Sequence, residues 1–139
     1  MMKKSNKKGF TLVELIVVIA IMAILAAVLV PTVTSKIKDA NSSAAKSDIS
    51  TLANSIQADV ISHWADETNT TLVYIGANGA VKTDAIKGVD DSATVGDVFW
   101  MRKKGGDDTW YISVNLKTGT VSEPTTATTN VPEDIKGSN

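Results

Sequence analysis

The residues in this chain that could do chemistry are few. Its 139 residues include no cysteine and one histidine, His63. The lack of cysteine excludes a thiolate metal site, a disulfide framework and a cysteine nucleophile. A single histidine cannot form a multi-histidine metal site and makes a Ser-His-Asp triad improbable. His63 shares a helix face with Leu52 and Ile56, which is typical of a packed residue at the edge of a core. We expect no catalytic residue, no cofactor and no enzymatic activity.

Two acidic pairs could suggest a calcium site. Asp90-Asp91 and Asp107-Asp108 each stand near a turn signal. Neither pair supplies the alternating oxygen ligands over about twelve residues that an EF-hand loop requires. Solvated turn carboxylates are therefore the favoured interpretation, and no metal site is expected.

One basic cluster could suggest a nucleic-acid surface. Arg102, Lys103 and Lys104 stand in sequence beside Trp100 and Trp110. Aromatic side chains among basic residues can bind single-stranded nucleic acid. Three charges on a hairpin rim are more typical of ordinary protein surface, so DNA is kept only as a minor alternative partner.

Glu14 is a charged residue at the edge of a long apolar run, and its presence there needs a physical explanation. It directly precedes a run from Leu15 to Ser35 that contains no charged residue. A carboxylate close to the hydrocarbon of a membrane is costly, although less so near its edge. Glu14 therefore either stays at the level of the lipid headgroups or has a partner of opposite charge.

Basic residues gather at the N-terminus, ahead of the apolar run. The first nine residues contain four lysines, whereas the formal net charge of the whole chain is −1, so the body is acidic. A basic stretch before roughly 20 apolar residues is the pattern of an export signal or a membrane-spanning helix. The run exceeds the h-region of a cleaved signal peptide, about 7–15 residues, which favours an anchor. The positive-inside rule then leaves the N-terminus cytoplasmic and the body outside.

Residues Lys7-Lys8-Gly9-Phe10-Thr11-Leu12-Val13-Glu14 resemble the prepilin-peptidase site of type IV pilins and pseudopilins. The family pattern is a short basic leader ending in Gly, followed by Phe, Thr, two aliphatic residues and a Glu at the fifth position after the cut. A long apolar helix comes next. Pro31 also matches, because pilins of this family commonly carry a proline near the end of the apolar run. The resemblance covers about residues 7–31 and is only architectural elsewhere.

The resemblance implies roles for four residues. A prepilin peptidase would cut between Gly9 and Phe10 on the cytoplasmic side, and the new Phe10 amine would be N-methylated. The Glu14 carboxylate would attract the α-amino group of Phe10 in a neighbouring subunit, which removes the cost of a lone buried charge. Pro31 lacks an N–H and its ring clashes with the preceding turn, so we expect a helix kink there.

The elements that must position these residues begin with one long helix. Residues 36–64 contain no Gly or Pro, and six apolar residues fall on one face of the helical wheel: Ile49, Leu52, Ala53, Ile56, Val60 and Trp64. Strands are predicted at 72–75, 80–83, 95–103, 109–116 and 120–122, with loop or a short helical piece at 84–94. The strand at 109–116 has the clearest pattern, because apolar and polar residues alternate along it.

The predicted fold class is α+β and pilin-like: one long N-terminal helix packs on a small antiparallel β-sheet of three to four strands. The first half of the helix is transmembrane and the second half is amphipathic. The predicted segments are a leader peptide at 1–9, a transmembrane and filament-core helix at 10–35, an amphipathic helix of the globular head at 36–64, an antiparallel β-sheet head at 65–123 and a flexible C-terminal tail at 124–139.

The function that the resemblance implies is that of a structural subunit of a type IV pilus. The membrane-anchored prepilin would be processed and polymerised into a helical surface filament for adhesion, motility or DNA uptake. A pseudopilin of a type II secretion or competence machine has the same N-terminus and is the first alternative. A single-pass anchored surface binding protein that never polymerises is the second.

The partners implied are further copies of the chain, a prepilin peptidase, an inner-membrane assembly platform and, before assembly, membrane lipid. Many Gram-negative pilins close a C-terminal loop with a cysteine pair. The lack of cysteine in this chain favours a Gram-positive source.

Overall fold

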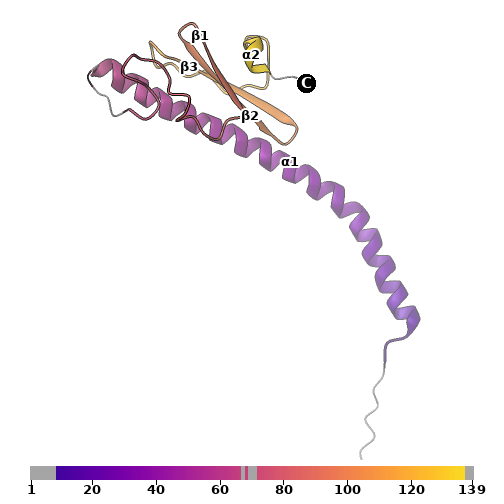
Figure 1. The fold of residues 1–139 in the computed structure, drawn as a ribbon. Helices are drawn as coiled ribbons and strands as arrows, with labels where there is room; N and C mark the ends of the chain where they lie inside the picture. Colours follow the sequence, from indigo (N-terminus) through magenta and orange to yellow (C-terminus); the bar gives the residue numbers. More distant parts are fainter. Residues whose placement is uncertain (1–8, 67, 69–71, 137–139) are drawn as a thin grey trace, which may run out of the picture. The chain divides into compact units, whose positions relative to one another are not determined.

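The computed structural model describes residues 9–66, 68 and 72–136 of the chain. Its elements are the helix α1 (Leu12–Ala65), the strands β1 (Asp91–Val95), β2 (Val98–Gly105) and β3 (Asp108–Asn115), and the short helix α2 (Glu133–Lys136), as Figure 1 shows. The chain divides into two compact units, Met1–Ile37 and Lys38–Asn139. The first part of α1 belongs to the first unit and its second part to the second unit.

The first unit consists, in its described residues, of a short lead-in and the apolar part of α1. The large apolar side chains from Phe10 to Ile37 are all exposed. This part of α1 is long and apolar enough to cross a membrane. Exposure of so many apolar side chains is unfavourable in water, so this segment requires a lipid or protein environment.

The second part of α1 is amphipathic and lies on the sheet. Its buried residues recur at helical spacing on one face: Ser42, Ala45, Ile49, Ala53, Ile56, Val60 and His63. This confirms the predicted apolar face over most of its length. The exception is Trp64, which stands at the end of the helix with 49% of its surface exposed.

The sheet has the order β1-β2-β3, and both pairs of neighbouring strands are antiparallel. Each hairpin turns through a Gly-Asp pair, Gly96-Asp97 in the first and Gly106-Asp107 in the second. Both glycines have a φ of 61°, and no non-glycine residue among those described has a positive φ. A glycine at the first turn position followed by a residue of negative φ defines a type II′ turn, whose twist suits the flanking strands.

The strand prediction needs one correction in this region. Residues 84–94 were expected to be loop or a short helical piece, and 95–103 a single strand. Instead, β1 occupies Asp91–Val95 and the Gly96-Asp97 turn separates it from β2. The predicted strands at 72–75 and 80–83 are reduced to a single bridge between Ile75 and Val81, and the one at 120–122 to a bridge between Val121 and Val114.

The main core lies between α1 and one face of the sheet. Ile49, Ala53, Ile56 and Val60 of the helix form one cluster with four strand residues, Phe99, Met101, Ile112 and Val114. The alternation predicted along 109–116 therefore directs Ile112 and Val114 to the helix. This confirms the α+β architecture of one long helix on a small antiparallel sheet.

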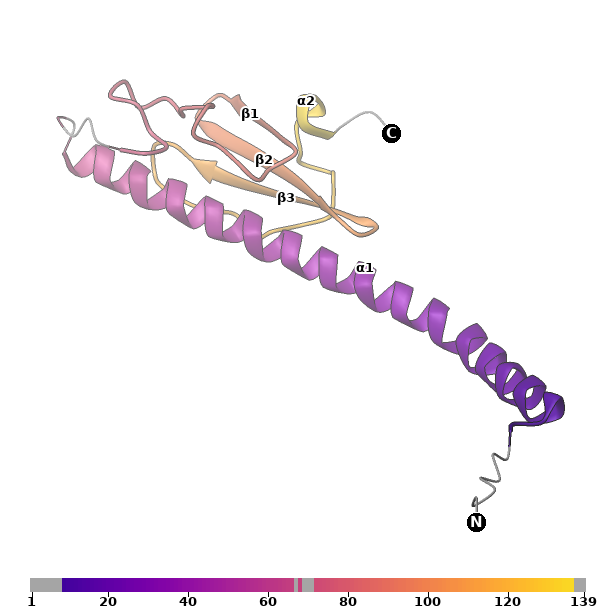
Figure 2. The ribbon, with the colours of Figure 1, turned by 60° about the horizontal axis from the view of Figure 1, so that its bottom comes forward.

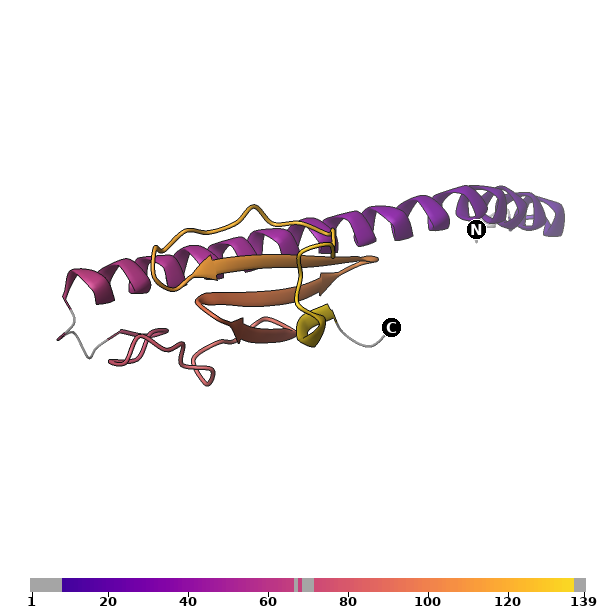
Figure 3. The ribbon, with the colours of Figure 1, turned by 90° about the horizontal axis from the view of Figure 1, so that it is seen from above.

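The opposite face of the sheet is covered by the C-terminal segment. Val131 and Ile135 are buried against Tyr111 of β3, and Thr125 forms a bridge with the same tyrosine. Figures 2 and 3 show α2 on the side of the sheet away from α1. The segment 124–139 was predicted to be flexible. Over 124–136 it instead packs on the sheet, because two of its few apolar residues find a partner in Tyr111; residues 137–139 lie outside the described part.

Candidate processing and assembly site

The predicted cleavage site lies in the extended segment that precedes α1. Phe10 is 92% exposed, and a side-chain carbon placed on Gly9 would meet no atom within 4 Å. Both sides of the Gly9–Phe10 bond are therefore sterically open, as a protease substrate must be. The basic residues Lys7 and Lys8 of the predicted leader lie outside the described residues.

Thr11 and Glu14 form a reciprocal pair at the start of α1. The Thr11 backbone N–H donates to Glu14 Oε2 at 2.8 Å, and the Thr11 hydroxyl donates to the same oxygen at 3.0 Å. The Glu14 backbone N–H in turn donates to Thr11 Oγ1 at 3.2 Å. This is the capping box of a helix whose N-cap residue is Thr and whose third residue is Glu. It satisfies two backbone N–H groups that the helix itself cannot bond.

The capping box also fixes where the Glu14 carboxylate stands. Both hydrogen bonds from Thr11 end on Oε2. The carboxylate is held beside the first turn of the helix, next to the backbone that follows Phe10, while Oε1 makes no hydrogen bond within the described part of the chain. An ionised carboxylate can accept about four hydrogen bonds. Glu14 therefore keeps capacity for a further cationic donor.

The structure thus brings together Thr11 and Glu14 at the first turn of α1, and Phe10 directly precedes Thr11 in the chain. The resemblance implies a partner for Glu14 in another subunit, and the bond of Glu14 to Thr11 in the same chain was not predicted. The signal was present, because Thr-x-x-Glu directly before an apolar run is the sequence signature of a capping box.

Pro31 lies inside α1, and the helix continues through it. Proline has no N–H to donate to the carbonyl of the preceding turn. Three hydroxyl groups close by donate to backbone carbonyls of the helix: Thr32 to Val28 at 3.1 Å, Thr34 to Val30 at 2.9 Å and Ser35 to Thr32 at 3.2 Å. Such side-chain bonds weaken and bend helices.

The other polar groupings do not form reactive sites. Among the described residues no three His, Asp or Glu side chains stand close enough to hold a metal ion. Asp90 accepts from the backbone N–H of Lys104, and Asp107 pairs with Lys38 at 2.9 Å. His63 is buried with 4% of its surface exposed, as expected of a packed residue.

The basic cluster is divided by the sheet. Trp100 packs with the Tyr111 cluster on one face, whereas Trp110 packs against the core on the α1 side. Lys103 pairs with Asp48 at 2.9 Å. Because side chains alternate along β2, Arg102 and Lys104 lie on the face of Trp100, whereas Lys103 lies on the α1 face with Trp110, so the cluster is split between the two faces of the sheet.

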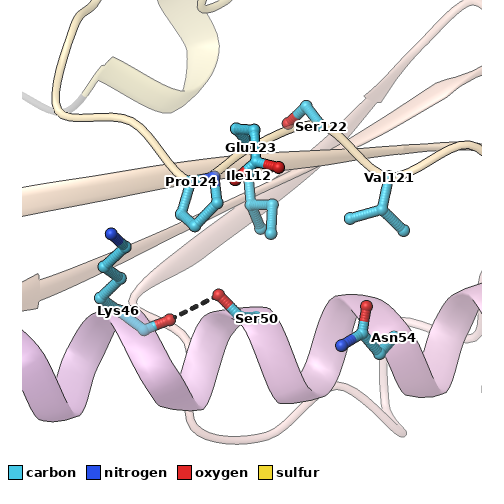
Figure 4. A pocket seen from close by; sticks show the side chains of 8 residues that line it. All are labelled: Lys46, Ser50, Asn54, Ile112, Val121, Ser122, Glu123 and Pro124. Atoms are coloured by element: carbon cyan, nitrogen blue, oxygen red, sulfur yellow. Dashed lines mark hydrogen bonds between the residues drawn. The ribbon is translucent and has the colours of Figure 1, made fainter.

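A hollow of about 440 Å³ lies between α1 and residues 121–124 (Figure 4). Its charged lining residues are Lys46 and Glu123, and the Ser50 hydroxyl donates to the Lys46 carbonyl at 2.7 Å. The Lys46 ammonium stands 5.0 Å from the centre of the Trp110 ring. Lys46 and Ser50 are occupied in local contacts, and the lining contains no paired nucleophile and base.

The described residues thus combine a helix long and apolar enough to span a membrane, an exposed Gly-Phe bond before it and a small α+β head. Residues 4–30 match the family model of the prokaryotic N-terminal methylation motif. The chain is 64% identical over 36 residues to the type IV wide pilus major component PilA4 of Thermus thermophilus, covering 26% of this chain and 28% of that protein. It is 38% identical over 64 residues to the type II secretion system core protein G of Pseudomonas aeruginosa, covering 46% of this chain and 45% of that protein.

These matches show that the N-terminal segment of the chain is similar to those of type IV pilins and pseudopilins. The matched stretches span less than half the length of either relative. No solved structure matches the chain.

Proposed function

We propose that this chain is a structural subunit of a type IV pilus, made as a membrane-anchored prepilin. The observation that carries the proposal is the exposed apolar part of α1 with Glu14 at its start and the open Gly9–Phe10 bond before it. An apolar helix that leaves a membrane must find other apolar surface, and further copies of the same helix supply it. A repeated heterologous contact between identical chains generates a fibre.

The first step of the proposal is processing. A prepilin peptidase cuts between Gly9 and Phe10 on the cytoplasmic side, removes the leader 1–9, and the new Phe10 amine is methylated. The anchor stays with the protein, because the cut precedes α1. The head, on the far side of the membrane, then reaches the cell surface when an inner-membrane assembly platform extracts the subunit from the lipid.

The second step is pairing between subunits. A methylated amine is still a cation and a hydrogen-bond donor, and the Glu14 carboxylate has capacity beyond its bonds to Thr11. In a low-dielectric filament core the pairing of these two charges offsets the cost of removing each from water. The Phe10 amine of one subunit therefore lies beside Glu14 of another and sets the stagger between neighbouring helices.

Pro31 has a role in the same proposal. The missing N–H, together with the hydroxyl bonds of Thr32 and Thr34, makes this part of α1 easier to kink than an ordinary helix. The kink lets the helix adjust as it packs among its neighbours. Spin labels placed on either side of residue 31 should report a broader distance distribution in the native chain than in Pro31→Ala.

Intact mass tests the first step. Protein sheared from cells should lack residues 1–9 and carry one added methyl group. An unprocessed mass, with the protein retained in the membrane, would favour a single-pass anchored binding protein.

Variants of Glu14 test the second step. Glu14→Ala should be cleaved normally yet fail to form filaments, because cleavage depends on the Gly9–Phe10 bond and assembly on the carboxylate. Glu14→Gln is the matched control for charge, because its amide oxygen can still accept from Thr11 although the side chain is neutral. It should also fail to form filaments, since a neutral side chain does not attract the Phe10 amine. Normal filaments from both variants would refute the pairing.

A pseudopilin of a type II secretion or competence machine is the second candidate. It is favoured by the similarity to a type II secretion core protein, which extends over more of this chain than the similarity to the pilus component. Long surface filaments after deletion of secretion genes would support the pilus. Loss of protein export or DNA uptake, with no long filaments, would support the pseudopilin.

A further inference from the structure

A hollow lies at the end of the head where α1 stops. It has a volume of about 310 Å³ and is lined by Trp64, by the turn around Asn78 and Gly79, by the first hairpin turn near Asp97, and by Lys117 after β3. In Figures 2 and 3 the end of α1, the turn between β1 and β2 and the end of β3 lie at the same end of the head. The hollow is distinct from the processing site and belongs wholly to the second unit.

The indole of Trp64 is fixed in place although it is half exposed. Its Nε1–H donates to the carbonyl of Leu116 at 2.7 Å. The ring of His63, itself buried, stands edge-on to it with centroids 4.9 Å apart and an interplanar angle of 72°. A rigid aromatic ring that remains exposed gives a ligand a large contact area at little cost in conformational entropy.

Gly79 keeps the indole uncovered. A side-chain carbon at this position would lie 3.9 Å from Trp64 Cζ2 and 3.3 Å from His63 Nε2. A side chain at this position would therefore start in contact with both rings. The absence of a side chain at this point therefore leaves open the apolar surface that Trp64 presents.

The rim of the hollow is polar but carries no net charge. The Asp97 carboxylate and the Lys117 ammonium pair at 2.9 Å, and both side chains are more than half exposed. Asn78 Oδ1 accepts from the Ala80 backbone N–H at 3.1 Å, which leaves the two amide N–H groups of Asn78 for a ligand. Donors and acceptors thus surround one apolar ring.

We propose that this hollow binds a neutral saccharide. A pyranose ring has an apolar C–H face that can stack on an indole and a perimeter of hydroxyl groups that donate and accept. An anionic ligand is disfavoured because Asp97 stands beside Lys117, and a purely apolar ligand would leave the polar rim unpaired. The volume is at the lower end of the range of small-ligand sites, about 300–1,000 Å³, which suits one or two sugar rings. The inference goes beyond the proposed function and does not depend on filament formation.

The test uses the full-length chain in micelles of a detergent without a sugar headgroup. Lactose, maltose and chitobiose are titrated while NMR follows the three tryptophan indole N–H signals. We expect at least one sugar to shift the Trp64 signal in a saturable way and to leave those of Trp100 and Trp110 unchanged. No saturable shift at Trp64 with any of the three sugars, up to about 100 mM, would overturn the proposal.

Variants distinguish specific binding in the hollow from nonspecific binding elsewhere on the protein. Trp64→Ala should abolish binding, followed in this variant through the backbone amide signals of Gly79 and Asp97 because the indole signal is lost. Because it also loses the bond to Leu116, Asn78→Asp is the second variant: it keeps the oxygen that accepts from Ala80, removes the amide donors, and should weaken binding about fivefold or more. Trp100→Phe, a change to a tryptophan outside the hollow, is the matched control and should bind like the native chain.

Two outcomes would reassign the hollow and overturn the saccharide proposal. One is saturable binding only of an acidic sugar such as sialyllactose. The other is a Trp64 shift produced by an apolar peptide and by none of the neutral sugars. Because the protein is unassembled in micelles, neither outcome bears on processing or polymerisation.

Discussion

The two Gly-Asp hairpin turns provide a matched pair of glycines with the same backbone and different surroundings. Gly96 and Gly106 share a φ of 61°. A side-chain carbon on Gly96 would meet nothing within 4 Å, whereas one on Gly106 would lie 2.5 Å from the carbonyl oxygen of Lys38 in α1. The neighbouring Gly105 is equally tight, since its side-chain carbon would overlap the carbonyl of Asn41. The tip of the second hairpin therefore lies directly against the helix where the head begins.

Replacing each glycine with alanine separates strain from packing. Both variants place a side chain at a positive φ, which costs about 1–2 kcal/mol. Gly106→Ala also forces the hairpin tip and the helix backbone apart, and overpacking of this kind costs about 1–3 kcal/mol more. The separation weakens nearby contacts too, including the Lys38–Asp107 ion pair and the hydrogen bond from Trp110 Nε1 to Ser42 Oγ at 3.1 Å.

The assay is thermal unfolding of the full-length chain in detergent, followed by tryptophan fluorescence. For a unit of about 100 residues, each kcal/mol lowers Tm by about 4–8 °C. Gly106→Ala should therefore melt at least about 4 °C below Gly96→Ala. Equal Tm values for the two variants would refute the contact between the hairpin tip and α1.

Three further outcomes follow from contacts described above. Thr11→Val removes the hydroxyl of the capping box and should lower hydrogen-exchange protection at the start of α1 about fivefold, whereas Thr11→Ser should preserve it; equal protection in both would contradict the capping box. Ile135→Ala should lower the free energy of unfolding by about 2–4 kcal/mol, measured by thermal denaturation, because Ile135 is 0% exposed. Asp134→Ala, at an exposed position of the same helix, should change it little, and an equal loss in both would show that the contact with Tyr111 is not the cause. Two hydrogen bonds from Thr68 lower the pKa of Asp66, so its carboxyl should titrate below the ordinary value for Asp. Thr68→Val should raise that midpoint by NMR, and the small stabilisation from these bonds is present near neutral pH and disappears as the pH falls through the folded pKa.

The long helix and the strand at 109–116 could be predicted because each carries its own period. Ile49, Ile56 and Val60 recur at helical spacing, and Ile112 and Val114 alternate with polar residues as a half-buried strand requires. These patterns arise from burial of one face and need no knowledge of the partner. The resemblance at the N-terminus was equally readable, since its residues are adjacent in sequence, and the methylation-motif model matches residues 4–30.

The first hairpin was missed for a local reason. Gly96-Asp97 is a type II′ turn signal, but the residues before it, Asp91 to Thr94, are small or polar and lack the alternation of a half-buried strand. An edge strand is exposed along one side and can be built from such residues. Reading the same Gly-Asp pair that recurs at Gly106 would have located the turn.

The packing of the C-terminal segment could not be predicted from its own residues. Val131 and Ile135 stand among polar residues and prolines, and this composition is typical of a loose tail. Their burial depends on Tyr111, which the strand pattern assigned to a polar face. Only the tertiary arrangement reveals that the tyrosine ring offers apolar surface on the side of the sheet away from α1.

The separation of the exposed apolar helix from a self-contained head has a genetic consequence. A substitution such as Ile135→Ala weakens the head, and an unfolded head is degraded, so its effect in a cell that also makes the native chain should be recessive. Substitution of Glu14 leaves the head folded and the helix in the membrane. In the proposed filament, such a subunit still offers its Phe10 amine to native neighbours and can occupy growing ends without sustaining them. Substitutions of Glu14 should therefore be dominant. A strain that carries one native and one substituted gene copy would distinguish them from the recessive substitutions in the head.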